Sequence, residues 1–352
     1  MSTPDLGAAH LGAPPQRAVT TPGTTHRVAR SSLTSWLGST GFLTVVVVLA
    51  VVPLAFIPTV IQQMTGFLIL VILAAMWNAL AGYGGLVSVG QQAYIGFGAY
   101  AVIFLTQRGL DPYLAIVLAA LVSGVLALLV SPLLLRLRGG QFAIGTWVVA
   151  EVIALIIVLQ KSLGGGTGIS LRALNSYAAA DRRAYTYWLT LAFTVVLLGA
   201  VLLLLRRRTG AALQAIRDDE DAAASVGVRT RPLKLVLFVL AGVGCGAAGA
   251  LTLANTLFIQ PQSIFGVQYT AFMIFMVLVG GLGTFEGPII GAVVFFFVQN
   301  QFADAGAWYL IGLGIVAVAF ALFLPRGLWS LAADRLPGPL LPVGYRLRST
   351  EP

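Results

Sequence analysis

The middle of the chain alternates between long apolar runs and one charged island. Residues 186–254 contain TYWLTLAFTVVLLGAVLLLL (186–205), RRRTGAALQAIRDDEDAAASVGVRTR (206–231) and LKLVLFVLAGVGCGAAGALTLA (233–254). The protein has 21 Lys and Arg and 12 Asp and Glu, and ten of these charged residues fall within the island. About 20 apolar residues suffice to cross a bilayer core of ~30 Å as a helix. The stretch therefore predicts two membrane-spanning helices joined by a hydrophilic segment.

The composition of the whole chain extends this interpretation. Of its 352 residues, 58% are hydrophobic and only 9% are charged, whereas soluble domains carry about 25% charged residues. Backbone groups in lipid must be paired internally, which allows helices or a closed barrel. The apolar runs are continuous rather than alternating, so we expect an all-α polytopic membrane protein. The net charge of +9 is typical of basic residues retained on the cytoplasmic side, and we expect no nucleic-acid partner.

Ten apolar segments are long enough to be candidate spans. An even number of crossings places both termini on one side, and most Lys and Arg then become cytoplasmic if the N-terminus is inside. The loop at 161–185, with Lys161, Arg172, Arg182 and Arg183, is the exception and is placed outside. The predicted spans are roughly 41–58, 62–82, 91–107, 113–135, 142–160, 186–205, 233–254, 267–282, 287–302 and 307–324.

Three regions of the chain follow from these spans. Residues 1–38 are rich in Ser, Thr, Pro, Gly and Ala, which predicts a mostly disordered cytoplasmic tail and not a signal peptide. Residues 39–330 form the predicted transmembrane domain, with the charged segment at 206–232, and residues 331–352 form a cytoplasmic C-terminal tail. We expect a multi-pass membrane protein with both termini in the cytoplasm.

Glycines interrupt several of the apolar segments. The stretch GYGGLVSVGQQAYIGFGAY at 82–100 has two such interruptions, which predicts a broken or re-entrant helix that is buried or lines a cavity. Asn78, Ser88, Gln91 and Gln92 are the polar residues near this break, and we assign them to a candidate translocation path.

Glu151 is the one carboxylate well within an apolar run. An ionisable residue inside the membrane is a functional hypothesis, so Glu151 joins the candidate path. The alternative is structural, with Glu151 protonated or paired with a nearby polar group so that it holds two helices together.

The charged island predicts a short amphipathic helix. Gly210 and Gly227 bracket sixteen residues dominated by good helix formers, and Leu213, Ile216, Ala223 and Val226 can fall on one side. The segment could be a solvated loop, a helix on the membrane surface, or a docking helix for a soluble partner. The four consecutive acids at 218–221 argue against an anionic membrane surface and favour docking.

Several kinds of chemistry are missing from the sequence. The only lysines, Lys161 and Lys234, do not stand in a GxxxxGK[ST] phosphate-binding loop. His10, His26 and Cys245 form no cluster within the spans that would suit a metal or a nucleophile. We expect no cofactor or metal on this chain and no enzymatic activity of its own.

The chain resembles the LivM-type permease subunits of ABC importers for branched-chain amino acids. The island matches the family's coupling segment at Gly210, Ala215, Ile216, Arg217 and Gly227, among others, and the break at 82–102 matches a glycine-rich motif that includes Gln91 and Tyr94. Further matches are LRLRGGQFAIGTWVVAE (135–151), GGGTGI (164–169), GGLGTFEGPIIGA (280–292) and FLPRGL (323–328). Departures from the family pattern fall at Gly140, at 145–147 and at Ala211.

The resemblance implies a multi-component importer of the bacterial cytoplasmic (inner) membrane. It implies a homologous second permease subunit, two cytoplasmic ATPases that hold ATP and Mg, and an external substrate-binding protein. The cargo would be branched-chain amino acids or related small polar solutes such as urea and amides. Tyr94 joins the candidate translocation path on this basis. The candidate ATPase-coupling residues are Gly210, Ala215, Ile216, Arg217, Asp218, Asp219, Glu220, Ala223 and Gly227. The rival hypothesis is a proton-coupled secondary transporter that uses Glu151.

Overall fold

The computed structural model of the chain describes residues 25–29, 33–302, 306–333, 335 and 346–350. The chain divides into two compact units, one from residues 1–30 and 345–352 and one from residues 31–344. In the first unit, strand β1 (Thr25–Ala29) pairs antiparallel with β4 (Arg346–Thr350). Residues 1–24 and 30–32 of the predicted tail lie outside the described residues, whereas 25–29 form this strand and α1 begins at Leu33.

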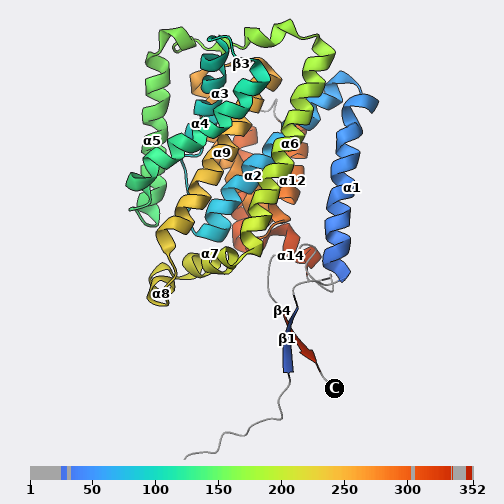
Figure 1. Cartoon of the computed structure of the whole chain (residues 1–352), viewed down its shortest axis with the longest axis vertical. Coiled ribbons are helices and arrows are strands. Elements are labelled where there is room, and N and C mark those ends of the chain that lie inside the picture. The colour runs from blue at the N-terminus through green and yellow to red at the C-terminus, as the bar shows by residue number, and fades with distance from the viewer. Residues whose placement is uncertain (1–24, 30–32, 303–305, 334, 336–345, 351–352) are drawn as a thin grey trace, which may run out of the picture. The chain divides into compact units, whose positions relative to one another are not determined.

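The second unit is a bundle of helices (Figure 1). Two short strands, β2 (Ile169–Ser170) and β3 (Phe258–Ile259), pair antiparallel. The helices are α1 (Leu33–Ala55), α2 (Pro58–Asn78), the π-helical η1 (Ala79–Tyr83), α3 (Gln92–Thr106), α4 (Pro112–Leu134), α5 (Gly140–Leu159), the 3₁₀ turns η2 (Lys161–Leu163) and η3 (Arg172–Ser176), α6 (Ala179–Arg206), α7 (Arg208–Asp218), α8 (Glu220–Ser225), α9 (Thr230–Thr256), α10 (Pro261–Ile264), α11 (Gln268–Gly280), α12 (Gly287–Phe302), α13 (Ala307–Phe323) and α14 (Gly327–Ala333).

All ten predicted spans coincide with helices. Among the described residues, six helical stretches are long and apolar enough to cross a membrane by themselves, and α3, α12 and parts of α1 and α13 are shorter apolar helices. The eighth span is preceded by the separate turn α10, which begins at Pro261. The prediction of an all-α polytopic membrane protein is confirmed.

Helix α9 lies in the middle of the bundle, between α2, α3 and α4 (Figure 1). Small residues let these helices approach closely in lipid. A Cβ added to Gly98 of α3 would lie 2.2 Å from the carbonyl oxygen of Gly246 in α9. A Cβ added to Gly249 of α9 would lie 1.8 Å from the carbonyl oxygen of Ile95. The α3–α9 contact therefore excludes side chains at these positions.

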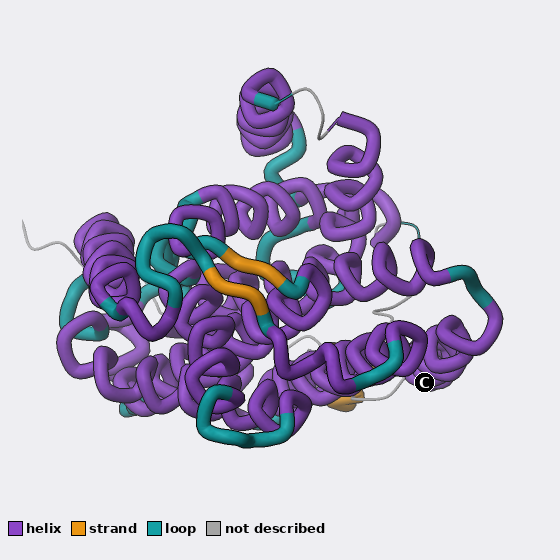
Figure 2. The backbone as a smooth tube through the Cα atoms, turned by 90° about the horizontal axis from the view of Figure 1, so that it is seen from above, coloured by secondary structure: helices purple, strands orange, loops and turns teal. Residues whose placement is uncertain are grey.

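The two ends of the bundle differ. Helices α7, α8 and α14 lie at one end, together with the beginning of α1 (Figure 1). The strands β2 and β3 lie across the opposite end, facing the viewer in Figure 2. The helical unit therefore begins and finishes at the end that carries the charged island, as an even number of crossings requires.

Candidate functional site

The chain is not helical between η1 and α3. Residues 85–90 form neither helix nor strand, and Gln91 already has helical backbone angles (φ −66°, ψ −24°). This connection, called the extended segment below, is held by a hydrogen bond from the Trp77 indole Nε1 to the Ser88 carbonyl oxygen (2.9 Å). The Val89 N–H donates to Thr146 Oγ1 of α5 at 3.1 Å. At 15 residues, α3 is about 22 Å long, which is shorter than a bilayer core of ~30 Å. Helix α3 is therefore too short to cross such a core alone, and the non-helical residues before it confirm the predicted broken helix.

A polar cluster lies where the extended segment enters α3. Ser88, Gln91 and Gln92 are all 0% exposed. The Gln91 amide nitrogen donates to Ser88 Oγ at 3.1 Å, and Thr270 Oγ1 of α11 donates to Gln92 Oε1 at 2.6 Å. Gln91 Oε1 and Gln92 Nε2 have no hydrogen-bond partner among the residues that the structure describes. Buried polar atoms without partners cost about 1–3 kcal/mol each, so this cluster has unused capacity to bind a polar molecule.

Tyr94 and Asn78 lie on either side of this cluster in the sequence, but their side chains contact residues outside it. Tyr94 is buried, and its ring packs edge-on against Phe238 of α9, with 5.9 Å between centroids. Asn78 donates to the Thr284 carbonyl oxygen and accepts from the Gly283 N–H, both at 2.8 Å. Asn78 thus joins the end of α2 to the loop between α11 and α12.

Glu151 lies away from the other candidate path residues. It is exposed, and its carboxylate accepts a hydrogen bond from the indole Nε1 of Trp147, one turn earlier in the same helix (3.1 Å). Of the most apolar 18 residues of α5, only 22% are buried by the rest of the chain. Ile144, Val148 and Leu155 are exposed nearby in the sequence. This bond lies within α5 and joins no second helix.

The charged island forms two helices, so the expectation of a single amphipathic helix over 210–227 is wrong. Helix α7 ends at Asp218 and α8 begins at Glu220, because Asp219 adopts an extended conformation (φ −157°, ψ 109°). The Asp219 carboxylate accepts hydrogen bonds from the N–H groups of Asp221 (3.0 Å) and Ala222 (2.9 Å). Asp is a favoured N-cap residue, and here it starts a new helix instead of continuing the first.

Helix α7 is fixed to the bundle by one face and one side chain. Gly210, Leu213 and Ile216 are buried, and Ala215 is half-buried. Arg217 Nη1 donates to the carbonyl oxygen of Gly82 in η1 at 3.0 Å. A Cβ added to Gly85 would lie 3.2 Å from the Cα of Arg217. Helix α7 therefore touches the π turn and the start of the extended segment directly.

The remaining island residues form and surround α8. Ala223 is buried, whereas Val226 is 79% exposed, contrary to its expected place on the buried side. Gly227 takes a left-handed conformation (φ 89°) where α8 ends, which is a common way to terminate a helix.

The four acids of the island all have partners within the chain. Asp218 pairs with Arg217 at 2.8 Å, and Asp219 caps α8. Glu220 Oε2 lies 2.5 Å from the ammonium of Lys234, and Asp221 lies 3.0 Å from Arg138. Besides Asp221, the exposed residues of α8 are small or apolar, namely Ala222, Ala224, Ser225 and, at its end, Val226.

Sequence reasoning missed the partners of the candidate residues. Thr270 and Thr284 bind the predicted polar residues Gln92 and Asn78, and Thr146 binds the N–H of Val89 beside Ser88. Arg138 and Lys234 bind the acids of α8. A threonine in an apolar run can as easily bond its own helix, so its role could not be identified. Lys234 is a lone cation at the start of an apolar run, and this position alone could have indicated that it pairs with an acid of the island.

Comparison with known proteins gives consistent results. Residues 59–333 match the profile of the family described as "Branched-chain amino acid transport system / permease component". The chain is 28% identical to the high-affinity branched-chain amino acid transport system permease protein LivM of Salmonella typhimurium over 296 residues, covering 76% of this chain and 69% of that protein. It is 28% identical to LivM of Escherichia coli over 323 residues, covering 84% and 76%. The ribose import permease protein RbsC of Escherichia coli is 27% identical over 110 residues, or 30% and 34% of the two chains. No solved structure matches the chain significantly.

Proposed function

The chain belongs to the family of permease components of branched-chain amino acid transport systems, and from this premise we propose that it is the membrane-spanning subunit of an importer driven by ATP hydrolysis on separate subunits. Its partners are a homologous second permease subunit, two cytoplasmic ATPases that bind ATP and Mg, and an external binding protein. The cargo is a branched-chain amino acid or a related small polar solute such as urea or an amide. In this assembly α7 and α8 face the cytoplasm and both termini are cytoplasmic.

The observation that carries the coupling role is the bond between Arg217 and the Gly82 carbonyl oxygen (3.0 Å). An ATPase that holds the exposed side of α7 and α8 pushes on a helix whose buried side rests against the broken end of α2. Asn78 continues this contact to the loop before α12 through Gly283 (2.8 Å). A displacement of α7 is thereby transmitted to the extended segment and to the polar cluster at Gln91 and Gln92.

The free energy needed to switch the permease between two states can be transmitted only by a helix that is packed firmly against the bundle. Shifting a two-state equilibrium from 1:99 to 99:1 needs about 5.5 kcal/mol of differential stabilisation. The buried face of α7 and the N-cap at Asp219 keep the island from dissipating that energy through local unfolding.

The second permease subunit covers the exposed face of α5. A carboxylate facing lipid is costly, and Glu151 stands on the helix that the chain itself covers least among the long apolar ones. Pairing across α5 would place Glu151 between the two subunits, beside the route of the solute.

Substitutions in the island test the coupling role. Arg217→Ala and Asp219→Ala are introduced into the complete transporter, and ATPase co-purification and ATP-driven leucine uptake are measured in proteoliposomes supplied with the binding protein. Loss of a hydrogen bond from a charged donor costs about 1.5–3 kcal/mol, so we expect uptake by Arg217→Ala to fall roughly 10- to 100-fold.

Arg208→Gln is the matched control. It removes an exposed cation at the start of α7 but keeps Arg217 and its bond to Gly82, so uptake should stay near the wild-type level. Unchanged ATPase binding and unchanged uptake in both alanine variants would remove the coupling role. Uptake by the chain alone in liposomes, driven by a pH gradient and indifferent to ATP, would favour proton coupling through Glu151 instead.

A further inference from the structure

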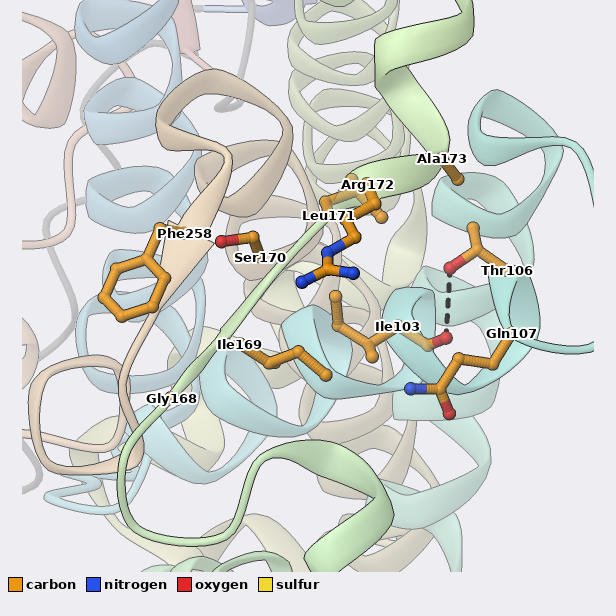
Figure 3. A pocket seen from close by; sticks show the side chains of 10 residues that line it. All are labelled: Ile103, Thr106, Gln107, Gly168, Ile169, Ser170, Leu171, Arg172, Ala173 and Phe258. Carbon is orange, nitrogen blue, oxygen red and sulfur yellow. Dashed lines mark hydrogen bonds between the residues drawn. The ribbon is translucent and has the colours of Figure 1, made fainter.

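A cavity of about 520 Å³ lies at the end of the bundle opposite α7 and α8 (Figures 1 and 3). Three segments that are distant in sequence line it: the last turns of α3, residues 168–173, and Phe258 of β3. Its volume falls within the ~300–1,000 Å³ typical of small-molecule sites.

The rim of the cavity is fixed by the backbone. Ser170 pairs with Phe258 in the β2–β3 ladder, and the Leu171 N–H donates to the Leu257 carbonyl oxygen at 2.9 Å. Gly168 takes a left-handed conformation (φ 91°), where an added Cβ would lie 2.5 Å from the Ile259 carbonyl oxygen. The cavity is therefore built before any ligand arrives.

Arg172 gives the cavity its chemical character. It is the one charged residue in the lining, and Figure 3 shows its guanidinium turned inward, between the side chains of Ser170 and Ile103. No carboxylate among the described residues forms an ion pair with it. Ile103, Ile169 and Phe258 supply apolar walls.

A guanidinium binds a carboxylate through two parallel hydrogen bonds. We propose that this cavity binds a small solute that carries a carboxylate on a short apolar body, with Arg172 holding the carboxylate. This inference rests on the proposed function, in which this end of the bundle is external and receives the solute. Among the cargoes named above, it favours an apolar amino acid over urea or a simple amide, because neither of the latter carries a negative charge.

The test uses the complete transporter in nanodiscs, without the binding protein, and L-leucine as the probe. Saturable binding of radiolabelled leucine is expected in the wild type. Arg172→Gln should weaken it roughly 10- to 100-fold, the range for losing a charged hydrogen bond, and Arg172→Lys should weaken it less. L-leucinamide, which keeps the side chain but lacks the carboxylate, should compete poorly. Lys161→Gln removes an exposed cation outside the cavity and should leave binding unchanged.

A second variant protects the test against misfolding at Arg172. Ser170→Trp fills the cavity from its exposed rim and keeps Arg172, and it should also abolish leucine binding. The proposal is overturned if wild-type transporter shows no saturable binding, if leucinamide competes as well as leucine, or if both variants bind leucine normally. In a second measurement, with the binding protein added, the proposal is also overturned if Arg172→Gln weakens only the docking of that protein, because the carboxylate would then belong to the binding protein.

ATP-driven uptake separates this inference from the proposed function. If the wild type imports no solute at the expense of ATP, the proposed function fails. If the wild type imports leucine and Arg172→Gln imports it equally well at low leucine concentration, only the role of the cavity fails.

Discussion

The ion pair between Lys234 and Glu220 holds α8 against α9, and its two ends have different surroundings. The two charged groups lie 2.5 Å apart, with the lysine side chain 8% exposed and the glutamate side chain 24% exposed. Arg138 Nε lies 3.9 Å from the same carboxylate oxygen. Removing the carboxylate leaves a nearly buried ammonium, whereas removing the ammonium leaves a carboxylate that water and Arg138 still reach.

This asymmetry predicts unequal costs. Removing one partner of a buried pair costs about 3–5 kcal/mol, and an exposed pair contributes about 0–1 kcal/mol. Because Glu220 is partly exposed, we expect Glu220→Gln to destabilise the docking of α8 by about 2 kcal/mol. Lys234→Met keeps most of the packed stem and should cost about 1 kcal/mol or less. The double variant should also cost about 1 kcal/mol, because no ammonium is left unpaired.

Hydrogen–deuterium exchange of the α8 amides measures these differences in the protein in nanodiscs. A cost of 2 kcal/mol corresponds to roughly 30-fold faster exchange. Asp218→Asn serves as the control, since Asp218 is 67% exposed and pairs outside this contact, and it should leave the exchange of α8 amides within about twofold. Equal acceleration by the two single variants, or additive effects in the double variant, would refute the reasoning.

Two further perturbations test the helical bundle. Gly249→Ala places a Cβ 1.8 Å from the Ile95 carbonyl oxygen, and such overpacking should lower the free energy of unfolding by about 3 kcal/mol or more. Gly199→Ala meets nothing within 4 Å and should raise the free energy of unfolding by up to about 1 kcal/mol. Thermal unfolding in nanodiscs compares the two variants. The hydroxyl of Tyr177 donates to Asp111 at 2.6 Å and holds the pKa of that carboxyl below its usual value, so wild type should be more stable than Tyr177→Phe above about pH 4, and this advantage should vanish as the pH falls through the lowered pKa. An advantage that is the same at pH 3 and pH 7 would contradict this assignment.

The spans and the break were predictable because both follow from local composition. Twenty apolar residues cross the membrane as a helix whatever surrounds them. The glycines at 82–98 weaken a helix wherever they stand. The extended segment before Gln92 therefore follows from residues that are adjacent in the sequence.

The division of the island into α7 and α8 was not predictable in the same way. Helix propensity favoured one continuous helix, whereas in the structure Asp219 caps α8 and its neighbours Glu220 and Asp221 pair with Lys234 and Arg138. Arg138 lies in the connection between α4 and α5, and Lys234 lies in the first turns of α9. The same holds for Gln92, whose partner Thr270 belongs to α11. The assignment of these residues to a translocation path and to ATPase coupling stays a prediction.

The uncovered face of α5 has a consequence for how the protein is made. A charged residue at the centre of a spanning helix raises its insertion free energy by about 3 kcal/mol, and each Leu, Ile, Val or Phe lowers it by about 0.3–0.6 kcal/mol. The apolar residues of α5 therefore carry Glu151 into the membrane during synthesis. In the assembly proposed above, a copy that lacks the second permease subunit keeps Glu151 exposed on α5, so unassembled copies differ from assembled ones at this face.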